Sequence, residues 1–303
     1  MKTTFLTYVF YSATVAFGSI NTSSTEDSGR LINVINPIEL YFKNFETLTK
    51  LEDWKEIITQ GKTALAFAKN ANRLQDEAKI CAQLASIAFY SGEYIQVLIY
   101  ANRCHELSKS FIDPTLFIRS LCLESAVYRA FAAKEKEELA QQISYLRAVE
   151  TAEEAAHIYF KNNIDNAKAK GEIYFNLGAA HADNPKGDLE KAIDSYFIAL
   201  ECFKKTNAIN DALRINIRLG KVYLLQKKYD LSQKIIDEVR SQISNERLAM
   251  HTDYLEAQLK LAINDLENAR ETAENGLARA KILGAKEDEL RLTLLLQIIQ
   301  NLT

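Results

Sequence analysis

The chain has 303 residues, of which 48% are hydrophobic and 25% are charged, with 3 prolines and 10 glycines. A composition rich in helix-forming residues and poor in turn formers favours an all-helical fold that is long enough to bury a sizeable core. The formal net charge is −3 and no run of lysine and arginine occurs, so the composition offers no electrostatic case for a nucleic-acid partner, whose binding proteins usually carry a clustered basic surface.

Residues 1–18 have the pattern of a secretory signal peptide. Lys2 is the sole early charge, Phe5–Phe17 is uncharged and largely apolar, and small residues precede Ser19. We therefore expect export, to a periplasm or to the exterior, with membrane association through these residues as the alternative. An uncharged run of roughly 13 residues is shorter than the ~20 that a membrane-spanning helix needs. Residues 19–32 are polar and predict a disordered linker.

Residues 33–303 predict a domain of repeated helical pairs. Small or apolar residues recur where the second helix of each pair meets its partner, at spacings of 40, 51, 44, 40 and 37 residues. This ladder consists of Ile57, Val97, Ala148, Ala192, Ser232 and Ala269. Fixed-period self-similarity predicts an all-α, right-handed superhelical solenoid of about six pairs. An apolar segment, Glu287–Leu302, predicts a C-terminal capping helix.

The 51-residue step contains a charged insertion, Ala133–Glu138. Its helix propensity predicts a helical pair that is longer than its neighbours. We expect its charges to form a solvated face, with a docking element for a partner as the alternative.

The repeat pattern is clearest between Ile215 and Val239. Leu219-Gly220 is followed by Tyr223, and a related order begins at Leu177-Gly178 and includes Gly187-Asp188-Leu189. This order resembles the tetratricopeptide repeat, in which a small residue lets two helices approach and an aromatic ring fills the gap. The resemblance is best at residues 171–240, extends more loosely over 38–285, and implies a binding function without naming a partner.

Two departures from that family are visible. The steps of about 40 residues exceed the usual period of about 34, and Tyr174 or Asn216 stands at the family's tryptophan position. The longer repeats resemble those of bacterial sensor and regulator proteins, and also the soluble NSF attachment proteins of vesicle fusion. The sequence does not choose between these subfamilies.

The sequence predicts no catalytic residue, no metal site and no cofactor. It contains no His-Glu-x-x-His, no Cys-x-x-Cys and no phosphate-binding glycine loop. We interpret the four scattered cysteines as small buried apolar residues. Export would permit one disulfide among them, and the sequence does not fix its pairing. Asp183 and Asp188 fall in a turn, and we expect both to cap helices. These patterns predict a protein that is not an enzyme.

A binding groove is the better candidate for function. In a stack of helical pairs the first helices line the concave side, and counting from the aligned small residues predicts its lining. The predicted groove residues are Lys79, Gln83, Phe89, Arg119, Phe175, Asn176, Arg214, Arg218, Lys221, Tyr254 and Gln258. The three basic residues between 214 and 221 share one helix face at spacings of four and three. Such a basic stripe suits a carboxylate or an acidic peptide.

The family resemblance implies a sharper alternative. Chaperone-binding tetratricopeptide proteins hold a peptide's terminal carboxylate with basic and asparagine residues from successive first helices. At the matching positions before Gly178 and Gly220 lie Asn176, Arg214 and Arg218. Arg119 would supply a further cation, although Leu123 stands where the family has asparagine. A carboxylate clamp, a looser acidic-peptide groove and a row of solvated charges remain open.

The sequence thus favours a non-enzymatic scaffold that binds a protein or peptide in its concave groove and is exported. The alternatives are a cytoplasmic peptide-sensing regulator, a membrane-associated adaptor of the vesicle-fusion type, and a structural subunit of a larger assembly. The identity of the partner is not contained in the sequence.

Overall fold

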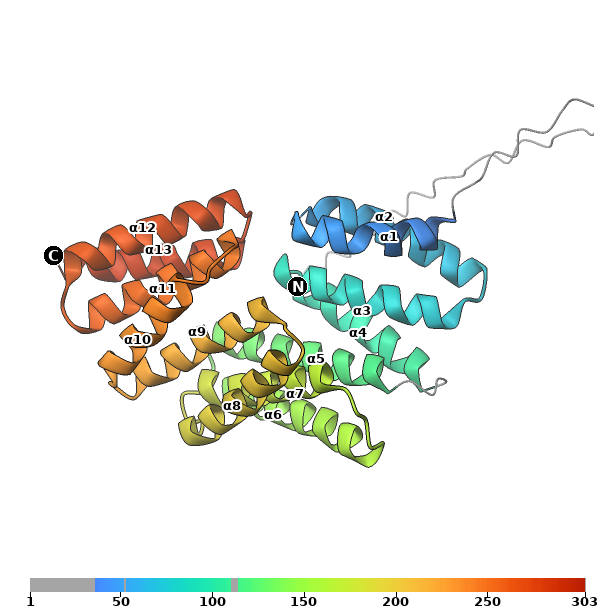
Figure 1. Ribbon diagram of the computed structural model, residues 1–303, viewed down its shortest axis with the longest axis horizontal. Coiled ribbons are helices and arrows are strands. Elements are labelled where there is room, and N and C mark those ends of the chain that lie inside the picture. Colours follow the sequence, from blue (N-terminus) through green and yellow to red (C-terminus); the bar gives the residue numbers. More distant parts are fainter. Residues whose placement is uncertain (1–35, 52, 110–113, 303) are drawn as a thin grey trace, which may run out of the picture. The chain divides into compact units, whose positions relative to one another are not determined.

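The computed structural model describes residues 36–51, 53–109 and 114–302, and these residues form thirteen α-helices and no strand. The helices follow one another as antiparallel pairs (Figure 1). Their bounds are α1 Pro37–Lys50, α2 Trp54–Asn70, α3 Leu74–Tyr90, α4 Tyr94–Ser108, α5 Thr115–Lys134, α6 Glu138–Lys161, α7 Ala167–Asp183, α8 Leu189–Lys205, α9 Ile209–Leu225, α10 Tyr229–Arg240, α11 Glu246–Ala262, α12 Leu266–Ile282 and α13 Lys286–Gln300. The predicted solenoid of six helical pairs followed by a terminal helix is confirmed.

The helices pack with their first or second neighbours along the chain. Each helix packs on the next one, and the first helices of the pairs also pack on each other from α3 through α5, α7, α9 and α11 to α13. The odd-numbered helices therefore form one layer and the even-numbered helices the other. All six residues of the predicted ladder are fully buried between these layers, so the pairing register read from the sequence is confirmed.

Glycines sit where two helices approach most closely. A Cβ on Gly178 would lie 2.8 Å from the ring of Tyr196, and one on Gly220 would lie 2.7 Å from Cδ2 of Leu255. Both distances are shorter than a normal contact, so a larger residue would force the helices or the side chains apart. These glycines do what the repeat pattern predicts for them.

Asparagine replaces glycine in most of the tight turns, which explains how so glycine-poor a chain forms them. Positive φ angles occur at Asn72, Asn163, Asn207 and Asn264, each just after a helix. Asparagine tolerates this left-handed conformation better than most residues because its short side chain bonds locally. Lys227 adopts it as well, with φ of 59°.

Short polar side chains also define where helices begin. Six helices have an asparagine or aspartate N-cap whose side chain accepts a backbone N–H bond: Asn36, Asp53, Asn166, Asp188, Asn245 and Asp265. The prediction of a cap is thus confirmed for Asp188. It is wrong for Asp183, which is the last residue of α7 and forms ion pairs instead.

The longest pair is α5 and α6, with 20 and 24 residues, whereas the other helices have 12 to 17. The predicted long pair is confirmed, but the charged insertion is not helical throughout. Residues 135–137 form the turn, and Lys134 ends α5 and pairs with Glu287 of α13.

The predicted terminal helix, α13, buries Leu292, Leu295 and Ile299 against its neighbours. Its exposed face is mixed, because Leu290, Leu294 and Ile298 are about half exposed among exposed polar and charged residues such as Arg291 and Gln297.

Within the described residues, none of the helices has the length and apolarity needed to cross a membrane. The predicted signal peptide, residues 1–18, and the linker, residues 19–32, lie outside the part of the chain that the structure describes.

Candidate binding groove

The first helices of the pairs line a cavity of about 660 Å³, which we call the groove. Eight of the eleven predicted groove residues lie in its wall: Phe89, Arg119, Phe175, Asn176, Arg214, Arg218, Lys221 and Tyr254. Lys79, Gln83 and Gln258 do not line it. The structure thus brings most of the predicted set together on one surface, while the binding role of that surface stays a prediction.

Basic side chains dominate the charge of the groove. The lining holds eight basic side chains and five acidic ones, a surplus of three positive charges in a chain whose net charge is −3. Burial lowers the pKa of His251, which also lines the groove, to about 4, so its imidazole is neutral at pH 7. An anionic ligand would therefore be attracted to the groove rather than to the rest of the surface.

Asp183 is the centre of the largest charge cluster in the groove. Its carboxylate accepts bonds from Lys221 Nζ at 2.9 Å, from Arg218 Nη1 at 3.1 and 3.3 Å, and from Arg129 Nη1 at 2.9 Å. We call these four residues the Asp183 cluster. It joins α5, α7 and α9, three successive first helices.

The cluster shifts the ionisation of its carboxylate. Burial acts to raise the pKa of Asp183, but Arg218, Lys221 and Arg129 outweigh burial and hold that pKa well below its usual value. The carboxylate is therefore ionised at every pH at which the protein is expected to be folded. Three cations surround this one anion, which leaves a local surplus of two positive charges.

The hydrogen-bonding capacity of the cluster is unevenly used. The two oxygens of Asp183 accept four bonds, which is close to the capacity of a carboxylate. Arg218 and Lys221 keep further N–H groups, and their side chains are 30% and 34% exposed. The cations can thus accommodate a second anion from the groove side, whereas Asp183 has no room for another donor.

The predicted carboxylate clamp does not exist as a set of free side chains. Asn176 is 7% exposed; its Oδ1 accepts a bond from Arg129 Nη2 at 3.1 Å, and its Nδ2 donates to the Glu172 carbonyl at 2.9 Å. Its amide is therefore committed to the core. Arg119 donates to Ser86 Oγ at 3.1 Å and has no ion pair among the described residues. The sequence missed Asp183 and Arg129 as partners in this region.

Arg214 separates from the other two members of the predicted basic stripe. It pairs with Asp211 at 3.0 Å, and its guanidinium lies 4.5 Å from the centre of the Phe175 ring. Only Arg218 and Lys221 converge on one partner. The stripe thus divides into two cations of the Asp183 cluster, Arg218 and Lys221, and a separate arginine stacked on an aromatic ring.

Aromatic rings supply the apolar part of the groove. The ring centre of Phe89 lies 5.6 Å from that of Tyr94 and 6.3 Å from that of Tyr90. The ring centres of Phe175 and Tyr196 are 6.2 Å apart. Tyr254 contributes a further ring from α11. The groove therefore combines aromatic surface with a larger number of charged groups.

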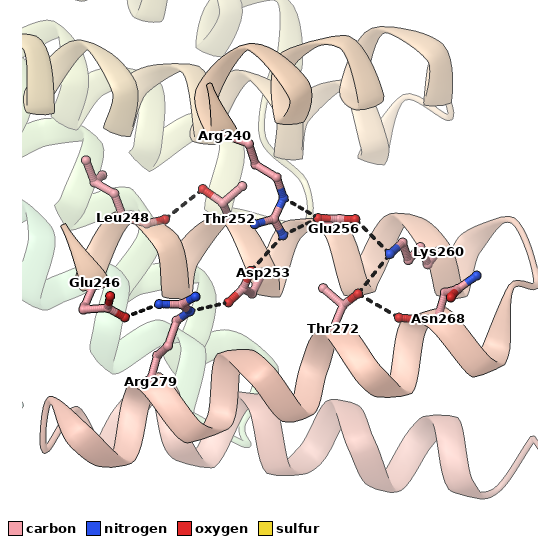
Figure 2. Close-up of polar contacts among 10 residues, drawn as sticks. All are labelled: Arg240, Glu246, Leu248, Thr252, Asp253, Glu256, Lys260, Asn268, Thr272 and Arg279. Carbon is pink, nitrogen blue, oxygen red and sulfur yellow. Dashed lines mark hydrogen bonds and ion pairs between the residues drawn. The ribbon is translucent and has the colours of Figure 1, made fainter. Parts of the chain in front are cut away.

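A second charge cluster lies at the junction of α10, α11 and α12. Figure 2 shows Arg240 and Arg279 reaching the buried carboxylate of Asp253 from two sides, at 2.8 and 3.0 Å. Arg240 also bonds Glu256, which in turn pairs with Lys260 at 2.8 Å. These residues bond one another rather than the groove, so we interpret this cluster as a link between neighbouring helices.

The four cysteines are free and buried, as the sequence predicted. Among the described residues no group of three or more histidine, cysteine, aspartate or glutamate side chains could hold a metal ion. The described lining of the groove offers charge, hydrogen-bonding groups and aromatic surface.

Comparison with known proteins supports the fold. No family model and no curated protein matches the sequence. Among solved structures, a Rap protein complexed with competence and sporulation factor is similar, with a TM-score of 0.59 and 13% identity over 89% of this chain and 77% of that one. The Rap conjugation gene regulator of the plasmid pLS20, in complex with the Phr* peptide, gives a TM-score of 0.57 and 14% identity over 88% and 80%.

A third similar structure is BtubC (BKLC) from P. vanneervenii, with a TM-score of 0.53 and 16% identity over 76% of this chain and 92% of that one. At these identities the likeness shows the fold alone. The chain is a helical-repeat protein, and its groove is the candidate ligand-binding site.

Proposed function

We propose that this protein is a non-enzymatic regulator that senses a peptide, with the peptide bound along the groove. The observation that carries the proposal is the convergence of all six first helices, α1, α3, α5, α7, α9 and α11, on one cavity lined by aromatic rings and surplus positive charge. Two of the similar structures are complexes, one with competence and sporulation factor and one with the Phr* peptide, and the latter protein is a conjugation gene regulator. This favours the regulator over the exported scaffold that the sequence put first.

Two further parts of the proposal name the peptide groups that bind and the type of repeat. An acidic side chain or a terminal carboxylate of the peptide would bind the spare N–H groups of Arg218 and Lys221, next to Asp183. The aromatic rings of Phe89, Phe175 and Tyr254 would contact its apolar side chains. We also propose that the pairs are extended tetratricopeptide repeats, since Gly178 and Gly220 hold the close-approach positions of that motif.

Binding of defined peptide pools tests this proposal. One fluorescein-labelled hexapeptide pool is enriched in aspartate and glutamate, and a matched pool is enriched in lysine and arginine. We expect saturable binding of the acidic pool alone. Lys221→Gln should weaken it roughly ten- to a hundredfold, because a charge-assisted hydrogen bond contributes about 1.5 to 3 kcal/mol.

The matched control is Lys204→Gln on the exposed side of α8, which should leave the affinity unchanged. Amidation of the peptides' C-termini distinguishes recognition of an acidic side chain from recognition of the terminal carboxylate. Only a site for the terminal carboxylate would lose affinity. Equal binding of both pools, or an unaltered affinity of Lys221→Gln, would show that the groove does not recognise anionic peptides.

Export remains a second candidate, and the observation that favours it is the signal-like pattern of residues 1–18. The intact mass of the protein from each fraction of its host tests it. Loss of these residues together with recovery outside the cytoplasm supports an exported binding module. A full-length chain in the cytosol supports the regulator, and a full-length chain in the membrane fraction supports an adaptor anchored by its N-terminus.

A further inference from the structure

Side chains from α2, α3 and α5 contact side chains from α11 and α13 across the groove. In a solenoid each unit normally contacts its neighbours alone, and the helices of this protein pack with first or second neighbours. Contacts between α2 or α3 and α11, and between α5 and α13, are therefore exceptions that need an explanation.

The first of these contacts is an aromatic and cationic stack. Trp54 of α2 and Tyr90 of α3 are stacked, with ring centres 5.7 Å apart and an interplanar angle of 20°. The guanidinium of Arg247, from α11, lies 5.4 Å from the Tyr90 ring centre and 5.7 Å from that of Trp54. Arginine over aromatic faces at such distances is an attractive arrangement.

The second contact is an ion pair close to the turn between α3 and α4. Lys134, the last residue of α5, pairs with Glu287 in the first turn of α13. Lys134 Nζ also lies 4.9 Å from the ring centre of Tyr94. Glu287 approaches the turn between α3 and α4 as well, because a Cβ on Gly92 would lie 3.3 Å from its Cγ.

These two contacts share a physical character. Both consist of long side chains that are partly exposed: the Lys134 side chain is 48% exposed, that of Glu287 27%, and Tyr90 is 39% exposed. Such interactions are individually weak. They can therefore break without unfolding either end of the solenoid, while the packed helix pairs stay intact.

We propose that Trp54, Tyr90 and Arg247, together with Lys134 and Glu287, form a latch that closes the solenoid across the groove and opens to admit the ligand. Tyr90, Arg247 and Glu287 also line the groove, so a ligand there contacts the latch directly. Ligand binding and closure are thereby coupled. The ligand part of this inference rests on the proposed function, whereas the existence of the latch does not.

The distance between the two ends of the ligand-free protein tests the latch. Spin labels are placed on cysteines introduced at Lys62 of α2 and Lys281 of α12, which are both exposed. The four native cysteines are buried, and burial raises the pKa of Cys81 to about 12 and that of Cys104 to about 11, so labelling favours the introduced sites. Double electron–electron resonance then measures the distance distribution.

Lys134→Glu places two like charges at the latch, and we expect it to lengthen and broaden the distribution. The double variant Lys134→Glu/Glu287→Lys restores the attraction and should restore the wild-type distribution. The matched control is Lys186→Glu, because Lys186 pairs with Glu138 at 2.7 Å between neighbouring pairs and not across the groove. It should leave the distribution unchanged. Arg247→Gln provides an independent opening variant through the aromatic stack.

Unchanged distributions in both Lys134→Glu and Arg247→Gln would overturn the latch. So would an equal change in Lys186→Glu, or a charge-swapped variant that stays open. Since no ligand is present, failure of the peptide proposal would leave these results intact. If the acidic peptide pool binds, the open variants should bind and release it severalfold faster, and unchanged rates would overturn the coupling.

Discussion

At the scale of single residues, the Asp183 cluster shows how the groove keeps its basic residues in place. Arg129 is 7% exposed, and a buried guanidinium is stable only when it is paired. Asp183 supplies the countercharge and at the same time orients Arg218 and Lys221 from α9. One carboxylate thus holds three cations from two other helices at fixed positions.

Replacing this carboxylate should destabilise the fold. Asp183→Asn leaves Arg129 buried without an anion, and we expect a loss of about 2 to 4 kcal/mol in the free energy of unfolding, measured in urea. Asp188→Asn is the matched control, since asparagine caps a helix as well as aspartate does. It should change stability by less than about 0.5 kcal/mol. Equal effects of the two substitutions would contradict a special role for Asp183.

The sequence could not reveal this cluster. Asp183 lies 54 residues from Arg129 and 35 from Arg218 along the chain, and its position at the end of α7 resembles that of a capping residue. A helical period shows which residues share a face of one helix. It does not show which side chain of a neighbouring helix meets them, because that depends on the packing distance and on the rotamers.

Glu124 of α5 gives the stability a pH dependence of its own. Burial, assisted by the charge of Glu154, raises its pKa to about 7. A raised pKa means that the folded state binds the proton more tightly than the unfolded chain. The protonated Glu124 side chain therefore makes its full contribution to stability below about pH 4.3, the pKa of glutamate in the unfolded chain. That contribution is lost as the pH rises through 7.

Glu124→Gln should remove this dependence. We expect the variant to be about 1 to 2 kcal/mol more stable than wild type at pH 8, a figure discounted for partial solvent exposure, and to differ little at pH 4.5. Urea unfolding at the two pH values measures the difference. The exposed Glu150, changed to glutamine, serves as the control and should show no such dependence; a stability gain that is the same at both pH values would argue against a shifted carboxyl.

At the scale of the elements, close approach at glycines sets the geometry of each pair. At Gly178 a Cβ would meet the fully buried Tyr196 ring at 2.8 Å and the Ala192 carbonyl oxygen at 3.1 Å. At Gly220 the nearest atom would be the end of the flexible Leu255 side chain. A rigid ring and a backbone oxygen yield less readily than a terminal methyl group.

Gly178→Ala should therefore cost more than Gly220→Ala, although alanine favours both helices equally. We expect Gly178→Ala to lose about 1 to 3 kcal/mol by overpacking, and Gly220→Ala to lose less than half of that. Thermal or urea unfolding of the two variants checks the order. The reverse order would mean that the α7–α8 pair relaxes more easily than its packing suggests.

The elements were the most predictable level of this structure. The recurring Leu-Gly and small-residue positions defined six pairs and their register, because each of these positions faces a neighbouring helix and tolerates little volume. The turns were harder to predict, since left-handed residues such as Asn72 and Lys227 carry no strong signal in a glycine-poor chain. The charged run at Glu135–Glu137 shows the same limit, because helix propensity suggested a helix where the chain turns.

At the scale of the whole repeat domain, the groove differs from the rest of the surface in the sign of its charge. It carries a positive surplus in an acidic chain, which steers anionic ligands toward one site. The first helices of the pairs bring this charge together, as the sequence predicted. Arg218, Phe175 and Tyr254, three of the residues that the sequence placed in the groove, line the cavity, and their role in binding stays a prediction.

The extent of the groove along each helix could not be predicted. Lys79 and Gln83 occupy the same face of α3 as Ser86 and Tyr90, but they precede the part of α3 that reaches the cavity. Periodicity fixes the direction of a side chain around the helix axis. It does not fix how far along that axis the neighbouring helices leave open space.

The central claim is that a peptide lies in the groove, and photo-cross-linking tests it most directly. The acidic hexapeptide pool is made with one benzoylphenylalanine, cross-linked to the full chain, and mapped by mass spectrometry. We expect cross-links on α3, α5, α7, α9 and α11, around Phe89, Phe175 and Tyr254, and we expect Lys221→Gln to reduce them. Cross-links confined to the even-numbered helices, or spread evenly over both layers, would contradict the claim.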